Sequence, residues 1–282
     1  CLAGRLSSNV RRHTTTIAVA RLVLHHYTSG SGLLGIFDSD QLCATKIQYL
    51  NDASEFKHAI TEARGALHAR EHPAVDPIER ALALGLSEML ERIEDLNVYV
   101  ACLSAVEDSL SQWRGYCPPG FGYSLGFHAD ELRRVAAASR FELVECIYDP
   151  MRQLQLVQNW ANRSISALRK SLPAGLEPRA HVEHSGHLFF PEFVRFAPAM
   201  KNQAFRAEYE WRLVSDIMST AEVKLRPGRS MLLPYVPVPL NLAANDKLLW
   251  NICVGPTPNM RLATSAVANL FQRAHIENGG GQ

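Results

Sequence analysis

Strand patterns and helix patterns alternate along almost the whole of this chain, and that alternation constrains its fold more than any other feature. Short segments with strand-like composition or alternation include 22–29, 97–104, 207–214 and 247–254. Longer segments between them place apolar residues three and four apart, as amphipathic helices do. The sequence therefore predicts an α+β fold in which helices pack against a sheet.

Two of the predicted helices are marked by capping residues as well as by periodicity. Asp52 and Glu55 have the spacing of a capping box and lead into the amphipathic segment 56–67. Asp76, followed by Pro77, has the residues that begin another helix. Because Asp52 and Glu55 already have this structural role, we weigh it above a catalytic one.

The composition is that of an ordinary globular protein. Of the 282 residues, 47% are hydrophobic and 20% are charged, and the net charge is +1, so no global field for nucleic acid or membranes is implied. No apolar run reaches the roughly 18 residues that a membrane-spanning helix needs. The six cysteines are scattered and form no CxxC pair. This argues against a zinc ribbon and favours a reducing, cytoplasmic location.

The chain is expected to form one main domain between two less ordered ends. Residues 1–21 are rich in Arg, Ser and Thr but have no apolar signal core, so we expect a disordered or loosely attached leader. Residues 22–276 are predicted to form a single α+β domain with helical insertions. The glycine-rich residues 277–282 are predicted to be a flexible tail.

The segment AEYEWRLV at 207–214 carries the most distinctive charge pattern. With a period of two, its charged residues share one face and its apolar residues the other. The charged residues are Glu208, Glu210 and Arg212, and the apolar ones are Tyr209, Trp211 and Leu213. We expect the apolar face to be core, and a solvated face is the simplest explanation of the charges. Alternatively, the neighbouring charges give the two carboxylates different pKa values and different roles.

Two other segments gather groups that can hold a planar, charged ligand. His26, Tyr27 and Thr28 lie at the end of the strand 22–29, where sites often form. Trp113, Arg114 and Tyr116 lie in a polar connection at 107–116 and offer aromatic faces and a guanidinium fork. The alternatives are a structural histidine in the first segment and a tryptophan-anchored turn in the second.

A histidine-rich segment at 181–187 raises the question of a metal site. It reads HVEHSGH, with Glu183 between His181 and His184. The spacing matches no zinc-binding arrangement that we recognise, and a glycine interrupts it. We therefore predict an exposed polar loop that holds no metal.

Five short motifs resemble the bacterial family called domain of unknown function 2971. They are HYTS at 26–29, YLND-x-x-E at 49–55, S-x-W-R-x-Y at 111–116, E-x-E-W-R at 208–212 and V-G-P at 254–256. The motifs follow the order of the family, and the resemblance extends from about Leu22 to Phe271. His25 departs from the family, which commonly has an aromatic or apolar residue there.

The layout of that family in turn resembles ADP-ribosyltransferases, including DNA-modifying toxins. In those enzymes a strand-end histidine binds the nicotinamide ribose, an aromatic residue packs on the nicotinamide, and a late strand carries the catalytic glutamate. The resemblance implies His26 in the first role, Tyr116 or Trp113 in the second, and Glu210 or Glu208 in the third. The glutamate would bind the ribose 2′-OH and stabilise an oxocarbenium-like centre as nicotinamide leaves.

This resemblance implies an ADP-ribosyltransferase-like fold with a mixed, mainly antiparallel sheet that is split around a cleft, and with helices outside. Glu210, in the reacting role, and Glu208 are the candidate catalytic residues. The candidate residues for binding NAD, which is the substrate, are His26, Tyr27, Thr28, Ser104, Trp113, Arg114, Tyr116 and Arg212. Six residues are expected around one concavity: His26, Trp113, Arg114, Tyr116, Glu208 and Glu210.

The predicted function is NAD-dependent ADP-ribosyl transfer to a protein or nucleic acid. We consider a toxin or an anti-phage effector as its biological role. No membrane partner is expected. Three alternatives remain. The first is an NAD glycohydrolase that uses the same site. The second is a nucleotide-sensing binding module without chemistry. The third is a metal-dependent nuclease built on His181, Glu183 and His184.

Overall fold

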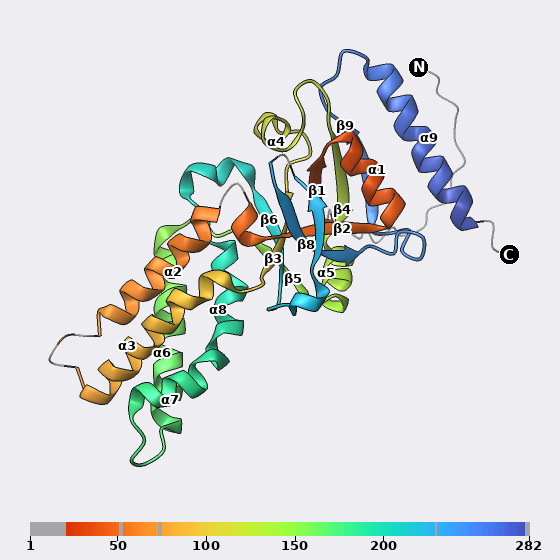
Figure 1. The fold of residues 1–282 in the computed structure, drawn as a ribbon. Coiled ribbons are helices and arrows are strands. Elements are labelled where there is room, and N and C mark those ends of the chain that lie inside the picture. The colour runs from red at the N-terminus through yellow and green to blue at the C-terminus, as the bar shows by residue number, and fades with distance from the viewer. Residues whose placement is uncertain (1–20, 51–52, 71, 73–74, 229, 280–282) are drawn as a thin grey trace, which may run out of the picture.

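The protein is built on one large sheet, which we describe from a computed structural model. The structure describes residues 21–50, 53–70, 72, 75–228 and 230–279. Within these residues nine strands form a single sheet (Figure 1). The strands are β1 (Val23–Thr28), β2 (Gln41–Lys46), β3 (Tyr99–Ser104), β4 (Tyr123–His128), β5 (Phe141–Glu145), β6 (Glu210–Ser215), β7 (Lys224–Pro227), β8 (Leu232–Pro239) and β9 (Leu249–Val254).

The sheet divides at β3. One edge of β3 pairs with β6 from Val100 to Ser104. The other edge pairs with β2 at its beginning, at Tyr99 and Val100, and with β1 at its end, at Ser104. Strands β2, β8 and β7 therefore lie on one side of the division, and β1, β4 and β9 lie on the other.

All pairs between these named strands are antiparallel, which confirms the predicted α+β fold with a mainly antiparallel sheet. A parallel bridge joins Ile147 to Met200 outside the named strands.

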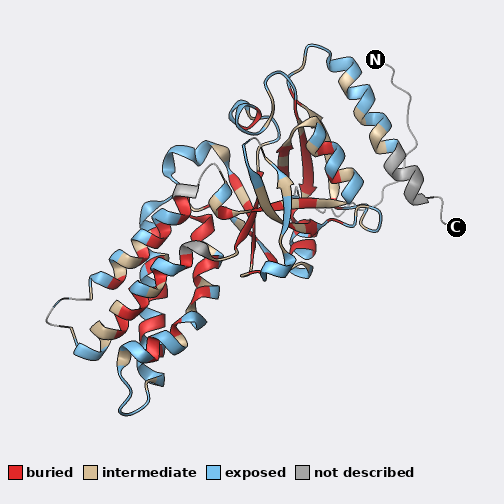
Figure 2. Cartoon of the chain, viewed as in Figure 1, coloured by how far each residue is buried: buried red, intermediate tan, exposed pale blue. Residues whose placement is uncertain are grey.

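Helices cover the sheet and also form a bundle that extends from it (Figure 1). They are α1 (Gly30–Ser39), α2 (Ala53–His68), α3 (Pro77–Glu91), α4 (Leu110–Tyr116), α5 (Ala129–Ala138), α6 (Pro150–Ser171), α7 (Pro178–Ser185), α8 (Phe190–Phe196) and α9 (Met260–Gly279). The bundle consists of α2, α3, α6, α7 and α8, and its buried residues face inward (Figure 2). None of the helices in the described part of the chain has both the length and the apolar character of a membrane span.

Strands β3 and β6 contribute to two apolar cores because their side chains alternate between the faces of the sheet. Val100 and Val214 join the core of the helical bundle, which also contains Trp160 and Phe193. Their neighbours along the strands, Ala101 and Leu213, join the core on the other face. One face of β6 is thus directed toward the helical bundle.

Capping positions α3 as the sequence predicts. The side chain of Asp76 accepts hydrogen bonds from the backbone amides of Ile78 and Glu79, and Pro77 occupies the first turn. Glu55 lies in the first turn of α2, but Asp52 lies outside the described residues.

Two segments predicted to be connections contain helices. The connection at 107–116 contains α4, in which Trp113 is buried. The prediction of an exposed polar loop at 181–187 is wrong, because α7 continues to Ser185 and His181 is buried. Val182 of α7 packs so closely on α3 that a Cβ added at Gly85 would lie 3.2 Å from it.

The two ends of the chain also differ from expectation. The periodicity of the last helix predicts a buried face that includes Met260, but this is wrong, because α9 is largely exposed where its side chains are described and Met260 is 47% exposed. The predicted tail at 277–282 begins too early, since α9 continues to Gly279. The leader predicted at 1–21 lies outside the described residues except for Arg21.

Candidate functional site

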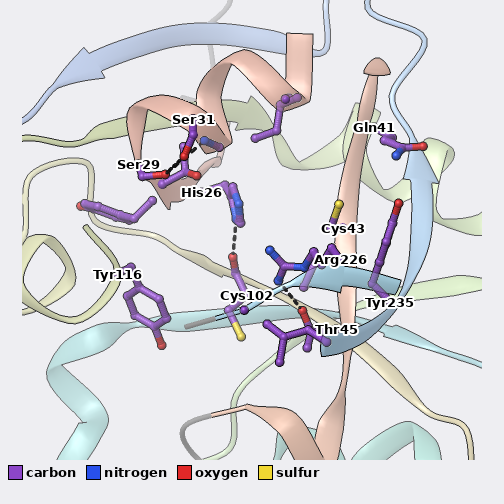
Figure 3. A pocket seen from close by; sticks show the side chains of 18 of the residues that line it. His26, Ser29, Ser31, Gln41, Cys43, Thr45, Cys102, Tyr116, Arg226 and Tyr235 are labelled. Atoms are coloured by element: carbon purple, nitrogen blue, oxygen red, sulfur yellow. Dashed lines mark hydrogen bonds between the residues drawn. The ribbon is translucent and has the colours of Figure 1, made fainter. Parts of the chain in front are cut away.

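A cavity of about 900 Å³ lies where the sheet divides (Figure 3). Its walls come from β1 and α1 on one side and from β2, β7 and β8 on the other, with β3 and α4 between them. His26, Tyr27 and Thr28 of β1 and Tyr116 of α4 line it. Four of the predicted ligand-binding residues therefore surround one cavity, although they come from distant parts of the chain.

Hydroxyl groups and a single guanidinium dominate the polar lining. Among the described lining residues Arg226 is a cation and no carboxylate is present. Arg226 Nη2 donates a hydrogen bond to Thr45 Oγ1 at 2.8 Å. Ser29 and Ser31, at the beginning of α1, line the same cavity (Figure 3). The cavity thus has a positive charge and many hydrogen-bonding groups.

His26 is held in one orientation and is neutral. Its Nδ1 lies 3.0 Å from the carbonyl oxygen of Cys102, which can only accept, so Nδ1 carries the proton. Burial lowers the pKa of His26, and Arg226 lowers it further. The other ring nitrogen, Nε2, is therefore an acceptor.

Trp113 supports the site and does not line the cavity. Its ring contacts the edge of Tyr27 with centroids 4.6 Å apart, and its Nε1 donates to Asp108 at 2.6 Å. A Cβ added at Gly255 would lie 2.9 Å from the Trp113 ring, so the close approach of β9 requires glycine there. Trp113 and the V-G-P motif thus fix the wall behind Tyr27.

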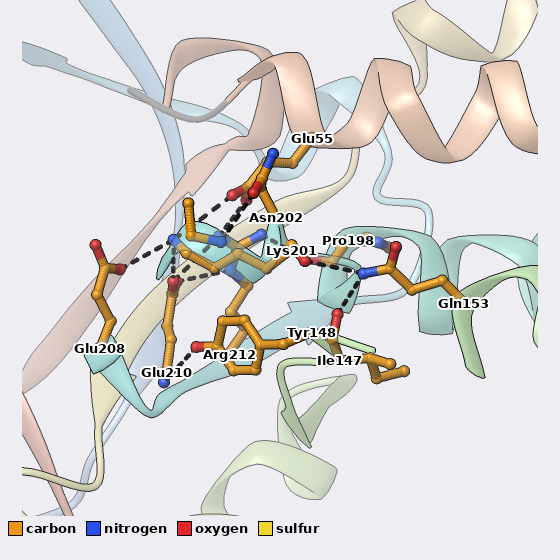
Figure 4. A network of polar contacts seen from close by, with 11 residues as sticks. Glu55, Ile147, Tyr148, Gln153, Pro198, Lys201, Asn202, Glu208, Glu210 and Arg212 are labelled. Atoms are coloured by element: carbon orange, nitrogen blue, oxygen red, sulfur yellow. Dashed lines mark hydrogen bonds and ion pairs between the residues drawn. The ribbon is translucent and has the colours of Figure 1, made fainter. Parts of the chain in front are cut away.

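A buried cluster of charges lies on the bundle side of β6 (Figure 4). Glu210 accepts from Arg212 Nε at 2.7 Å and pairs with Lys201 Nζ at 2.6 Å. Lys201 also lies 3.0 Å from Glu208, and Arg212 donates to Glu55 at 2.9 Å. We call these five residues, Glu55, Lys201, Glu208, Glu210 and Arg212, the charge cluster.

This burial corrects the expectation of a solvated charged face. Glu210, Arg212 and Lys201 are each buried, because α2 covers the face and supplies Glu55 from 157 positions away in the sequence. Arg212 Nη1 also donates to the carbonyl oxygen of Pro198 at 2.6 Å. The apolar face is less buried than expected, since Trp211 is half-buried and the guanidinium of Arg133 lies over its ring.

The strand also begins later than the alternation predicts. Strand β6 starts at Glu210, whereas Glu208 ends a 3-10 helix that spans Gln203–Glu208. Tyr209 adopts a left-handed conformation with φ 44° and is 58% exposed, so it does not belong to the core. Ser104 holds this turn by donating to the backbone carbonyl oxygen of Glu208 at 2.7 Å.

The two glutamates of the motif have different environments. Burial raises the pKa of Glu210, but Arg212 and Lys201 outweigh burial and lower the pKa to about 2. Glu210 is therefore ionised, and its side chain is only 3% exposed. The side chain of Glu208 is 18% exposed, so it is the more accessible carboxylate of the two.

Cys102 and Tyr116 connect the cavity to the charge cluster. Both line the cavity. Burial raises the pKa of Cys102, and the charge of Glu210 raises it further. Burial also raises the pKa of Tyr116, with further contributions from Cys102 and Glu210. The carboxylates thus lie behind the wall that these two residues form.

The six residues expected around one concavity are only partly brought together. His26 and Tyr116 line the cavity, and Glu208 and Glu210 belong to the adjoining cluster. Arg114 is exposed and is not part of the cavity lining. The sequence reasoning missed Arg226 and Lys201, because neither belongs to a motif that it recognised.

The histidine segment has a structural explanation. His181 Nε2 lies 3.0 Å from the hydroxyl of Ser171, which links α7 to the end of α6. Within the part of the chain that the structure describes, no three potential metal ligands converge. The expectation that this segment binds no metal remains a prediction.

Comparison with known proteins confirms the family resemblance. The model of the family described as "Protein of unknown function (DUF2971)" matches residues 112–213. The matched segment contains most of the S-x-W-R-x-Y motif and all of E-x-E-W-R. No curated protein and no solved structure is significantly similar to the chain. The family description names no activity, so the argument for one rests on the geometry of the site.

Proposed function

We propose that this relative of the DUF2971 proteins transfers ADP-ribose from NAD to a protein or a nucleic acid, and that the fold is ADP-ribosyltransferase-like. The observation that carries the proposal is the place of the cavity, in the division of an antiparallel sheet. The cavity brings the strand-end residues His26 and Thr28 together with Tyr116, beside the carboxylates of the E-x-E motif. The transfer requires three roles: binding of the ribose, packing on the nicotinamide, and a carboxylate at the reacting centre.

His26 suits the binding of a ribose. Its Nδ1 proton is held by the Cys102 carbonyl, so Nε2 can accept a hydrogen bond from a sugar hydroxyl. Tyr116 offers a ring for packing on the nicotinamide, and it is 37% exposed. Orientation of the ribose and the ring in this way would place the glycosidic bond for reaction.

The carboxylates can divide the remaining work. Glu210 holds Lys201 and Arg212, and its charge is largely neutralised by them. Glu208 is more exposed and contacts Lys201 but not Arg212. We therefore assign contact with the ribose 2′-OH to Glu208 and a positioning role to Glu210, in place of the reacting role that the motif suggested for Glu210. A carboxylate at the developing oxocarbenium centre stabilises the transition state more than the ground state.

A nucleotide-sensing module is the second candidate. The observation in its favour is that the cations of the charge cluster already face carboxylates within the protein. Such a cluster can be purely structural, and the cavity would then bind a ligand without reaction. An NAD glycohydrolase would use the same residues with water as the acceptor.

Incubation of the purified protein with NAD labelled on its adenylate part, in the presence of cell extract, separates these functions. Transfer leaves the label on a macromolecule, hydrolysis leaves free ADP-ribose, and a binding module retains unchanged NAD. The proposal predicts label on protein or nucleic acid, which Glu208→Gln reduces by about 10²- to 10³-fold although circular dichroism shows the variant to be folded. A toxin or anti-phage role then predicts that expression of the wild type, but not of Glu208→Gln, slows bacterial growth.

A further inference from the structure

The guanidinium of Arg226 forms few hydrogen bonds with the described residues. The side chain lies in the wall of the cavity, and its Nε is buried without a hydrogen-bond partner. A single hydrogen bond, from Nη2 to Thr45 Oγ1, holds the group. Because a guanidinium has five N–H donors, several of them are available to a ligand.

The contrast with Arg212 shows what a structural arginine looks like in this protein. Arg212 pairs with Glu210 and Glu55 and also donates to a backbone carbonyl. Arg226 forms no ion pair with any carboxylate of the described residues, and none of those carboxylates lines its cavity. Arg212 is thus neutralised within the protein, whereas the charge of Arg226 is available to a ligand.

We propose that Arg226 anchors a phosphate-binding subsite in the cavity, with Thr45 holding the guanidinium in place and the first turn of α1 at the opposite wall. A guanidinium fork matches the oxygens of a phosphate, to which it donates two parallel hydrogen bonds. Ser29 and Ser31 add hydroxyls where α1 begins (Figure 3). The Ser29 hydroxyl caps α1 by accepting from the Gly32 amide at 3.1 Å and lies 3.0 Å from the Ser31 hydroxyl, and the positive end of the helix dipole at this point favours an anion.

The ligand class that fits is a nucleotide. The volume of about 900 Å³ is in the range of cofactor-sized sites. The rest of the lining includes the aromatic side chains of Tyr116 and Tyr235 and several hydroxyl groups, which suit a base and a ribose. The inference rests on the proposed function only for the choice of nucleotide as ligand, and it also holds for a protein that binds nucleotides without reaction.

Calorimetric titration with ADP, adenosine and inorganic pyrophosphate tests the subsite without any need for turnover. We expect ADP to bind more tightly than adenosine and pyrophosphate to bind detectably. Arg226→Met should lower the affinity for ADP and pyrophosphate by about 10- to 100-fold, since a hydrogen-bonded charge is lost. The affinity for adenosine should change by less than about twofold. Arg226→Lys, which keeps the charge but not the fork, should lose less. Arg152→Met, which removes an exposed arginine of α6, is the matched control.

Two results would overturn the subsite. One is ADP affinity that is the same for the wild type, Arg226→Met and Arg226→Lys. The other is a wild-type protein that binds neither ADP nor pyrophosphate. If Arg226→Met does not fold, as judged by circular dichroism, the comparison rests on Arg226→Lys. ADP binding that depends on Arg226, without any NAD turnover, would support the subsite and contradict the proposed function. NAD turnover that is unchanged in the Arg226 variants would support the proposed function and contradict the subsite.

Discussion

Replacement of Lys201 by methionine tests whether the charge cluster depends on its buried ammonium group. The side chain of Lys201 is fully buried, and its Nζ lies 2.6 Å from Glu210, 3.0 Å from Glu208 and 3.7 Å from Glu55. Among the described residues the cluster therefore holds three carboxylates and two cations. Without Lys201, Glu210 and Glu55 keep their contacts with Arg212, whereas Glu208 loses its ion pair with the buried ammonium.

The expected cost of Lys201→Met follows from this geometry. Loss of one partner from a buried ion pair typically costs about 3–5 kcal/mol, because the remaining charge stays buried without compensation. Methionine has a similar length and an apolar chain, so we expect little cost from packing. The free energy of unfolding at pH 7 should therefore fall by about 3–5 kcal/mol.

Urea unfolding followed by circular dichroism measures this change. The double variant Lys201→Met with Glu210→Gln should be more stable than the sum of the single effects predicts, since it removes both members of the closest pair. Lys170→Met, on the exposed end of α6, should change stability by less than about 0.5 kcal/mol. A cost below about 1 kcal/mol for Lys201→Met would refute the reasoning, because the ammonium would then not be holding the carboxylates.

Three further outcomes are expected. The pKa of Glu210 is lowered from 4.5 to about 2, so its ionised form contributes roughly 3 kcal/mol of stability above pH 4.5. This contribution should fade as the pH falls toward 2, and an acid titration of stability should be flatter for Glu210→Gln than for the wild type. Trp160→Ala should cost about 3–5 kcal/mol because the ring is fully buried, and the half-buried Trp211→Ala should cost less in the same urea assay. Elemental analysis should find no stoichiometric zinc, and His181→Ala should not change the metal content; zinc lost on this substitution would contradict the prediction.

Periodicity and capping residues were sufficient to predict most of the longer elements of the fold. The amphipathic segment 56–67 and the capping residue Asp76 specify their helices locally, so α2 and α3 could be predicted from the sequence. Helices α4 and α7 were missed because they are short and polar. Their stability comes from contacts distant in the sequence, such as that of Val182 with Gly85.

The candidate site could be predicted in part. Alternation places Glu210 and Arg212 on one face, but it cannot show whether that face meets water or another element. The element that decides is α2, which brings Glu55 onto the same face. Arg226 and Lys201 were not found because each lies outside the recognised motifs, and only the folded structure shows what surrounds them.

Release of nicotinamide from NAD by the purified protein tests the central claim most directly. The account predicts release by the wild type and a loss on the order of 10²–10³ in rate for Glu208→Gln, in a variant that circular dichroism shows to be folded. Absence of release by the folded wild type, or equal release by Glu208→Gln, would contradict it.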